Sequence, residues 1–437
     1  MEAPVVNVGI MTEKAISFVF HGEYVHTETG SFLKDEQRVI CINGQLMFNG
    51  KRYNEIFFEP VTPDSFFELK AVTIGIQFHW ERQEDQSFKG ALNLIATKKG
   101  ILAINQVDAE EYLASVISSE MKPTAPKEFL KAHVVISRSW LFSQVEQKRE
   151  HKQEKRKYKN ITRDNEQLIR WYDHEDHELF DVCADDHCQR YQGMTRIISP
   201  NVMNIINETR GEVLVEDNKI CDTRFSKCCG GVTELFENCW EPVHHPYLTT
   251  LYDGQSEELP DLTIEKEADS WIRTSPPAYC NSSNHAILEQ VLNDYDNETT
   301  DFYRWKVVYT QTQLSELVYR KSGIDFGEIL DLVPLERGTS GRIVRLKIIG
   351  THNSFIIGKE LEIRRILSET HLYSSAFVVD KRNIQNNVPQ AFVLTGAGWG
   401  HGVGLCQIGA AVMSTQGFDY KQILEHYFPG TEIEKRY

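Results

Sequence analysis

Glu120 is the residue whose place in the sequence best suits acid–base chemistry. On a helix of 3.6 residues per turn it lies four residues after Val116 and three after Ile117, so its carboxyl group shares their apolar face. Partial desolvation favours the protonated carboxyl, which is the form that a general acid needs near neutral pH. The alternative is that Glu120 points to solvent at the helix end or pairs with Lys131 or Arg138.

A second candidate is the glycine run at residues 396–410 (GAGWGHGVGLCQIGA), where six of fifteen residues are glycine. Such a run permits positive φ angles and a close approach of main chain to a ligand, and Trp399, His401 and Gln407 supply its large functional side chains. No Gly-Lys-Ser/Thr follows, so the run fits neither a phosphate loop nor a dinucleotide fingerprint. The alternative is a tight corner with Trp399 in the core.

A third candidate is a group of two imidazoles and two thiols in and before the segment DVCADDHC, which is a sufficient ligand set for tetrahedral zinc. The spacing is unusual because His187 and Cys188 are adjacent and must diverge to reach one ion. Three further cysteines could substitute, and buried inert thiols are the alternative. The candidate ligands are His177, Cys183, His187 and Cys188, and the possible substitutes are Cys228, Cys229 and Cys239.

Composition narrows the function classes. The chain has 437 residues with 41% hydrophobic and 25% charged side chains, which is ordinary globular usage. Subtracting 63 acidic from 47 basic residues gives −16, which opposes nucleic-acid binding and favours an uncharged polymer as partner. No apolar run reaches the roughly 18–20 residues of a transmembrane helix, and no secretory signal is recognised after Met1. Nine cysteines favour reduced thiols over a disulfide framework.

The elements that would position these residues follow from the hydrophobic periodicity. Short alternating runs separated by turns such as Asn49-Gly50 predict a β-rich region over residues 1–106. A core follows at 107–254, where Asp108 and Glu111 resemble a capping box for a helix ending near Met121, and Pro126 starts a second helix. Residues 255–302 read as an insertion. Residues 303–437 read as a strand-rich part that holds the glycine run and ends in helices over 409–416 and 420–427.

We therefore expect an α+β fold, with a β-rich N-terminal region, a helical catalytic segment and a mixed C-terminal part around a central cleft. In this order, five linked motifs resemble stage II sporulation protein D and the related amidase-enhancer proteins. They are VDAEEYL with SEM (107–113, 119–121), LKAH with SRS (130–133, 137–139), HCQRYQG (187–193), GGVTE (230–234), and the glycine run continued through GFDYKQILEHYFPGT (417–431).

The resemblance implies a lytic transglycosylase that acts on peptidoglycan glycan strands, preferably those stripped of stem peptides. Glu120 falls on the family's catalytic glutamate, and Lys131 and Arg138 fall on positions implicated in the same cleft. Zinc bound by the His/Cys box would be structural, since the chemistry requires no cofactor. We expect further sugar contacts from Tyr112, Tyr247, Trp399, His401 and Gln407.

Other functions remain open at this stage. Cys406 stands where many relatives carry serine, and Cys228-Cys229 precede the Gly-Gly segment in place of small polar residues. These departures favour a non-catalytic glycan-binding or amidase-stimulating protein, with a cell-wall amidase as partner. A zinc-stabilised structural protein is a third reading. The resemblance implies the cell envelope as location, whereas the absence of a recognisable leader favours the cytoplasm.

Overall fold

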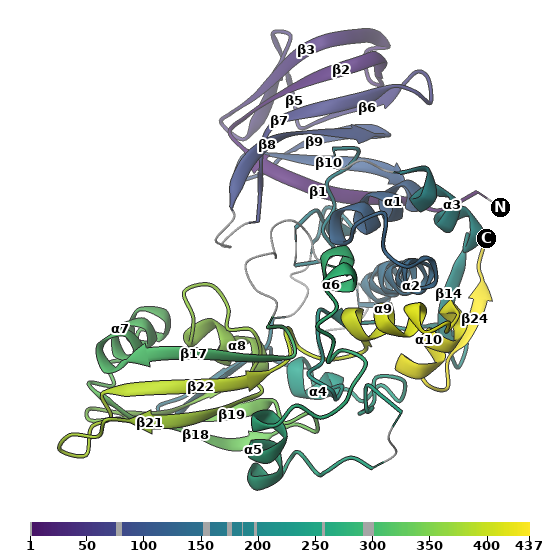
Figure 1. Ribbon diagram of the computed structural model, residues 1–437. Helices are drawn as coiled ribbons and strands as arrows, with labels where there is room; N and C mark the ends of the chain where they lie inside the picture. Colours follow the sequence, from purple (N-terminus) through teal and green to yellow (C-terminus); the bar gives the residue numbers. More distant parts are fainter. Residues whose placement is uncertain are drawn as a thin grey trace.

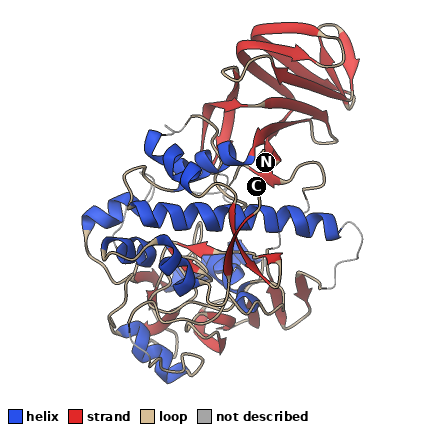
Figure 2. Ribbon diagram, turned by 90° about the vertical axis from the view of Figure 1, so that its right-hand side faces the viewer, coloured by secondary structure: helices blue, strands red, loops and turns tan. Residues whose placement is uncertain are grey.

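The computed structural model describes residues 2–75, 81–151, 158–172, 177–185, 187–195, 199–255, 258–291 and 301–437. Two strand-rich bodies lie on either side of a layer of helices, and the long helix of that layer runs between them (Figures 1 and 2). The predicted α+β class is confirmed. Within the described residues, no helix combines the length and apolar character needed to cross a bilayer.

The N-terminal body is one large antiparallel sheet in which the first strand pairs with the last. Phe18, Phe58, Phe67 and Phe88 are buried in its core, where the alternating pattern of the sequence places one face of each strand. The Asn49-Gly50 turn has positive φ at both residues, as a tight hairpin requires. The strands are β1 (Val5–Glu13), β2 (Ala15–His26), β3 (Ser31–Ile42), β4 (Gln45–Phe48), β5 (Lys51–Tyr53), β6 (Glu55–Pro60), β7 (Phe66–Ile74), β8 (Arg82–Lys89), β9 (Ala91–Ala96) and β10 (Ile101–Asp108).

The helical layer begins directly after β10, with α1 (Ala109–Glu120) and α2 (Lys127–His151). Asp108 is the N-cap of α1, and its carboxylate accepts hydrogen bonds from the amides of Glu110 and Glu111. Val116 and Ile117 are buried on the inner face of α1. The helix that the sequence predicts between Asp108 and Met121 is therefore confirmed. Both helices pack against α3 (Pro200–Glu208).

C-terminal segments complete the middle of the molecule. The last strand, β24 (Glu432–Lys435), pairs with β14 (Glu212–Glu216), and β23 (Leu405–Cys406) pairs in parallel with β16 (Phe225–Ser226). Two helices at the end of the chain, α9 (Gln407–Thr415) and α10 (Tyr420–Tyr427), pack on α2, and the second has the predicted bounds. The smaller elements here are β15 (Lys219–Ile220) and α4 (Phe236–Cys239). Strand β13 (Val182–Cys183) instead joins the N-terminal sheet, where it pairs in parallel with β1.

The second strand-rich body has its own hydrophobic core. Two sheets form it, in the orders β11-β12-β20-β19-β18 and β17-β22-β21. Its strands are β11 (Ile161–Arg163), β12 (Gln167–Arg170), β17 (Arg304–Thr310), β18 (Ile329–Arg337), β19 (Ile343–Gly350), β20 (Ser354–Gly358), β21 (Phe377–Arg382) and β22 (Ala391–Ala397), and its helices are α7 (Gln311–Ser322) and α8 (Glu360–Ile366).

The segment read as an insertion, residues 255–302, contributes α5 (Glu265–Arg273) and α6 (His285–Val291). Helix α5 packs on β21 and β22, whereas α6 packs on α9. Residues 256–257 and 292–300 of this segment lie outside the described residues. The segment therefore contacts both the second strand-rich body and the helical layer.

Candidate functional site

Glu120 is the last residue of α1, and its side chain is half-buried. Its Oε1 accepts a hydrogen bond of 3.3 Å from the backbone amide of Arg190. Lys131 and Arg138, the two cations that the sequence offered as partners, each pair with other carboxylates (described below). The amide of Arg190 therefore holds the candidate acid against the loop that contains the His/Cys box.

This loop, residues 187–193, is docked on α1 through both side chains and main chain. The Tyr112 hydroxyl donates to Oε1 of Gln189 at 3.3 Å, and the amide of Gln192 donates to Oγ of Ser115 at 3.2 Å. The ring of Tyr191 stacks on Tyr112 with centroids 5.1 Å apart. Because contacts on both sides of Arg190 fix the loop, the position of its amide relative to Glu120 is fixed as well.

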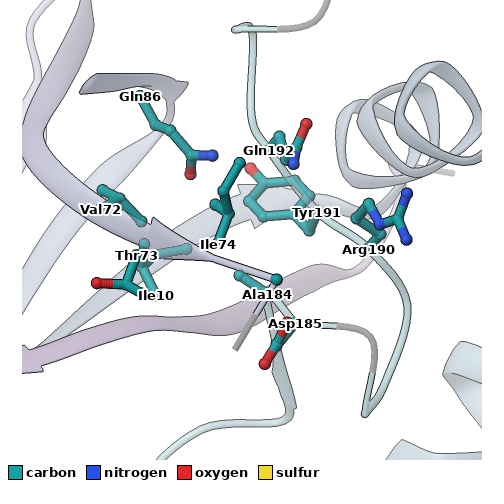
Figure 3. Close-up of a pocket in the computed structure, with 11 residues that line it drawn as sticks. Ile10, Val72, Thr73, Ile74, Gln86, Ala184, Asp185, Arg190, Tyr191 and Gln192 are labelled. Carbon is teal, nitrogen blue, oxygen red and sulfur yellow. The ribbon is translucent and has the colours of Figure 1, made fainter. Parts of the chain in front are cut away.

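A small, shallow recess opens where the loop meets the N-terminal sheet. Figure 3 shows Asp185 and the loop residue Arg190 on one side and the strand residues Thr73 and Gln86 on the other. Arg190 is common to the recess and to the hydrogen bond with Glu120. The recess thus begins next to the residue that holds the candidate acid.

The four predicted metal ligands lie together at the start of the same loop. One ligand atom of each of His177, Cys183, His187 and Cys188 lies within 4.8 Å of the others. Sγ of Cys188 is 3.5 Å from Nε2 of His177 and 3.7 Å from Nδ1 of His187. The adjacent His187 and Cys188 do reach a common point. Two thiols and two imidazoles at these separations fit a tetrahedral zinc ion after small movements.

Lys131 lies on α2 and forms ion pairs with Glu128 at 3.2 Å and Glu208 at 2.8 Å. Its ammonium group also lies over the ring of Tyr420, 5.4 Å from the centroid. Burial lowers the pKa of Lys131, but the hydrogen bonds that its ammonium group donates to Glu208 and Glu128 together outweigh burial and raise the pKa above its usual value. Lys131 is therefore held toward α3, and it does not pair with Glu120.

Arg138 is fully buried. Its guanidinium donates to both carboxylate oxygens of Glu110, at 3.0 and 2.7 Å, and to the carbonyl of Glu212 at 2.9 Å. The Tyr437 hydroxyl donates to the same carboxylate at 2.5 Å. The donors of Arg138 are used inside the protein, and its role in orienting Glu120 or a sugar stays a prediction.

The two tyrosines that we expected to contact sugar are both inside the protein. Tyr112 is 0% exposed, and burial raises the pKa of its phenol well above the usual range. The Tyr247 hydroxyl accepts from the amide of Asp222 at 2.9 Å and bonds Nδ1 of His245 at 3.1 Å. In this arrangement neither ring offers a face to a glycan, because protein covers both.

The glycine run is packed mostly by its own neighbours. Trp399 lies against Phe302 and Tyr373, with centroids 4.8 and 4.5 Å away. Nδ1 of His401 accepts from the amide of Val403 at 3.0 Å, and burial followed by nearby arginines lowers the pKa of this imidazole. His401 is therefore a neutral acceptor at a turn, as in the tight-corner alternative for this run.

Gln407 begins α9 and is buried. Its side-chain amide bonds Nε2 of His133 at 3.1 Å, and Nδ1 of His133 bonds Oγ of Ser137 at 3.2 Å. This buried chain of hydrogen bonds joins α9 to α2. Gln407 therefore links two helices inside the protein. A contact between Gln407 and sugar stays a prediction, because the side chain is buried in this structure.

Two family models match the chain, one described as stage II sporulation protein over residues 97–215 and one as a domain of unknown function (DUF8618) over 234–404. Stage II sporulation protein D of Bacillus amyloliquefaciens is 23% identical over 333 residues, covering 76% of each chain. The amidase enhancer of Bacillus subtilis (strain 168) is 24% identical over 248 residues, covering 53% of this chain and 32% of that protein. The chain is thus similar to stage II sporulation protein D and to the amidase enhancer, and the stage II sporulation protein model matches residues 97–215 of it.

An uncharacterized protein of Brachyspira hyodysenteriae is also similar, at 26% identity over 346 residues, or 79% of this chain and 72% of the relative. Within the family match at 97–215 lie Glu120, Lys131, Arg138 and the four candidate metal ligands. Tyr247, Trp399 and His401 lie in the DUF8618 match, and Gln407 follows it. The sporulation-protein segment thus contains the Glu120 side of the site.

The sequence did not predict a role for Arg190 in the site around Glu120. Its motif, HCQRYQG, marked the loop, but the contact with Glu120 is made by a backbone amide, which any residue type supplies. The sequence could not predict that Arg190 lines the recess either, because the opposite wall is formed by residues 72–74 and 86, which are distant in the chain. Only the tertiary arrangement identifies either contact.

Proposed function

We propose that this chain acts on the cell wall as a lytic transglycosylase that cleaves the β-1,4 bond between N-acetylmuramic acid and N-acetylglucosamine. The observation that carries the proposal is the half-buried Glu120 at the end of an apolar helix face, fixed by the Arg190 amide beside a recess. Similarity to stage II sporulation protein D and to the amidase enhancer supports a cell-wall role. Glycan strands already stripped of stem peptides are the proposed substrate.

One carboxyl group is sufficient for this reaction. Protonated Glu120 donates its proton to the glycosidic oxygen as the bond breaks and positive charge develops at the anomeric carbon. The resulting carboxylate then accepts the proton of the sugar's own 6-hydroxyl, whose oxygen bonds the anomeric carbon and closes a 1,6-anhydro ring. Proton and electron pairs balance without water and without a second carboxylate.

The protein's contribution is positioning. The Arg190 amide orients the carboxyl group of Glu120 through a hydrogen bond to Oε1. Lys131 is held by Glu128 and Glu208, and Arg138 by Glu110, so we assign both of them positioning roles within the helical layer. Neither is required to touch the sugar.

We also propose that His177, Cys183, His187 and Cys188 hold a zinc ion. Bound there, zinc would supply a fixed covalent-like cross-link at the start of the loop, because four protein ligands leave no open position for chemistry. Cys188 is two residues from Arg190, so this cross-link would fix the amide that orients Glu120. Zinc would thus support the site without taking part in proton transfer.

The second candidate function is a non-catalytic protein that binds glycan or stimulates a cell-wall amidase. It is favoured by the similarity to the amidase enhancer and by the burial of Tyr112 and Tyr247 inside the protein. A protein of this kind would need Glu120 only for its fold. The two candidates therefore differ in what Glu120→Gln does.

The test is digestion of denuded glycan strands followed by mass spectrometry of the products. Wild-type protein should release fragments ending in 1,6-anhydro-N-acetylmuramic acid, and Glu120→Gln should lower the rate by at least about 100-fold, since one general acid contributes roughly that much. Glu111→Gln is the matched control. It removes a carboxylate from the same helix that forms only a half-exposed pair with Lys89, so activity should be retained.

Reducing ends in the product, or equal rates for wild type and Glu120→Gln, would contradict the transglycosylase. If both proteins instead bind glycan equally and both stimulate an amidase, the second candidate is the function. Circular dichroism of both variants shows whether the fold is kept.

A further inference from the structure

A second group of metal-ligand side chains lies in the protein interior, away from the His/Cys box. It consists of Cys229, Asp253, Cys280 and Cys406, none of which is more than 2% exposed. One ligand atom of each lies within 4.8 Å of the others. The Sγ atoms of Cys229 and Cys280 are 3.6 Å apart, close to the roughly 3.8 Å that two Zn–S bonds of about 2.3 Å subtend at a tetrahedral centre.

Four separate segments bring these ligands together. Cys406 ends β23, which pairs in parallel with β16, and Cys229 lies three residues after the end of β16. The amide of Asp253 donates to the carbonyl of Gly231, which ties the second segment to the first. Cys280 lies between α5 and α6 in the insertion. No local sequence spacing connects the four residues.

Hydrogen-bond donors converge on the ligand atoms in the way that ionised ligands require. The amide of Cys229 donates to Sγ of Cys406 at 3.2 Å. The amide of Cys280 and the hydroxyl of Tyr427 donate to the two oxygens of Asp253, at 2.9 and 2.5 Å. Cys406 is also the N-cap of α9, where the helix dipole favours a negative sulfur. Outer donors of this kind orient and charge first-shell metal ligands.

Two simpler interpretations fit less well. All nine cysteines are free in the structure, so Cys229 and Cys280 do not form a disulfide. The second interpretation is a cluster of protonated groups without a metal, which gives no reason for four ligand atoms to converge within 4.8 Å of one another. Within the described part of the chain, no Lys, Arg or His forms an ion pair with Asp253, and a carboxylate buried without a cation is costly. A bound cation would compensate that cost.

We propose that Cys229, Asp253, Cys280 and Cys406 bind a thiophilic divalent cation of the zinc class as a closed structural site. Three thiolates exclude calcium and magnesium, which take oxygen ligands. Four protein ligands leave no open position, so the site binds no substrate. Binding releases the protons of the three thiols, and the ion then cross-links segments up to 177 residues apart.

Cys228 offers an alternative fourth ligand. Its thiol contacts those of Cys280 and Cys406, so a set of four thiolates would use Cys228 in place of Asp253. The variants Asp253→Asn and Cys228→Ser distinguish the two sets, because the variant of a true ligand weakens zinc retention. The site proposed here contains Asp253, because a carboxylate oxygen of Asp253 lies within 4.8 Å of the three sulfur atoms and the carboxylate accepts a hydrogen bond from the amide of Cys280.

The experiment measures zinc per chain by elemental analysis of full-length protein, purified with a reductant and without chelator. His187→Ala/Cys183→Ser removes two ligands of the partly exposed His/Cys box and should retain about one zinc per chain in the buried site. Cys280→Ala should lower the wild-type count by about one. Cys221→Ala is the matched control, because Cys221 is an equally buried thiol outside both groups and its loss should change nothing.

Wild-type protein without zinc overturns the proposal, whatever the variants do. So does an His187→Ala/Cys183→Ser protein that is folded by circular dichroism but holds no zinc. An unchanged zinc count in folded Cys280→Ala also overturns it. As a second readout, cobalt added to metal-free wild type should give thiolate-to-cobalt charge-transfer absorption. This absorption should persist in the His187→Ala/Cys183→Ser protein and disappear when Cys280→Ala is added to that double variant.

Discussion

Arg138 and Glu110 form a bidentate ion pair in which both side chains are almost completely removed from solvent. The pair joins the middle of α2 to the first turn of α1, the helix that ends at Glu120. Tyr437 donates to the same carboxylate. The position of the candidate acid therefore depends on a charge pair at the opposite end of its helix.

Breaking this pair should destabilise the protein strongly. Arg138→Ala leaves Glu110 buried without its cation, and the expected loss is about 3–5 kcal/mol of unfolding free energy. Urea unfolding followed by circular dichroism measures it. Lys127→Ala is the control on the same helix, because its pair with Glu208 is exposed and should contribute less than about 1 kcal/mol. Equal effects of the two substitutions would contradict a structural role for Arg138.

His133 should make the protein acid-sensitive. Burial, with a further contribution from Lys227, lowers the pKa of His133 to about 3 from 6.5. Between these values the unfolded chain binds a proton that the folded chain does not, so stability is lost as the pH falls below about 6.5. From pH 7 to 5 the loss from this group is about 2 kcal/mol.

The measurement is the urea midpoint at pH 7, 6 and 5 for wild type and His133→Gln. The variant should show a shallower decline with falling pH, because glutamine carries no titratable proton. The exposed His244→Gln should decline as wild type does. A decline that is equally steep in all three proteins would show that other groups cause the acid sensitivity.

Gly409→Ala should destabilise the protein even though it lies in α9, where alanine is the better helix former. A Cβ at this position would overlap the Tyr427 hydroxyl and the Asp253 carboxylate. Overpacking of this kind costs about 1–3 kcal/mol, more than the roughly 1 kcal/mol that helix propensity returns. Thermal unfolding checks the sign, and a raised midpoint would show that this contact relaxes freely.

Zinc at the His/Cys box and activity should respond differently to two substitutions. Cys188→Ser should lower both zinc content and the release of anhydro ends, because the loop that presents the Arg190 amide loses its cross-link. Glu120→Gln should abolish product while its zinc content equals that of wild type. Elemental analysis and product analysis on the same preparations are the measurements. A Cys188→Ser protein that holds little zinc but has full activity would show that zinc at the His/Cys box does not support the reaction at Glu120.

Local patterns were enough to predict the elements that carry the site. Helix α1 was predictable because Asp108 caps it and Val116 and Ile117 repeat at helical spacing, and α10 because its apolar residues repeat in the same way. The His/Cys box was predictable as a group because its four members lie within twelve residues, and they do lie together. These are short-range signals, which a sequence contains directly.

Burial could not be predicted in the same way. Tyr112 and Tyr247 have side chains suited to sugar, yet both are buried, and the half-buried Trp399 and His401 pack against Phe302, Tyr373 and Trp240 from distant segments. The identity of a side chain does not reveal which neighbours the fold will bring to it. The same reason hid the buried ligand group around Cys280, whose members come from four separate segments.

The pairing of β16 with β23 and of β14 with β24 implies an order in which parts of the chain can fold during synthesis. Ribosomes make a chain from its N-terminus, so the sheet that closes with β1 and β10 can form early, while the middle waits for residues beyond 405. Nascent chains halted before that point should leave Cys229 open to alkylation, and finished chains should protect it. Until the residues beyond 405 are made, β14 and β16 lack the strands that pair with them.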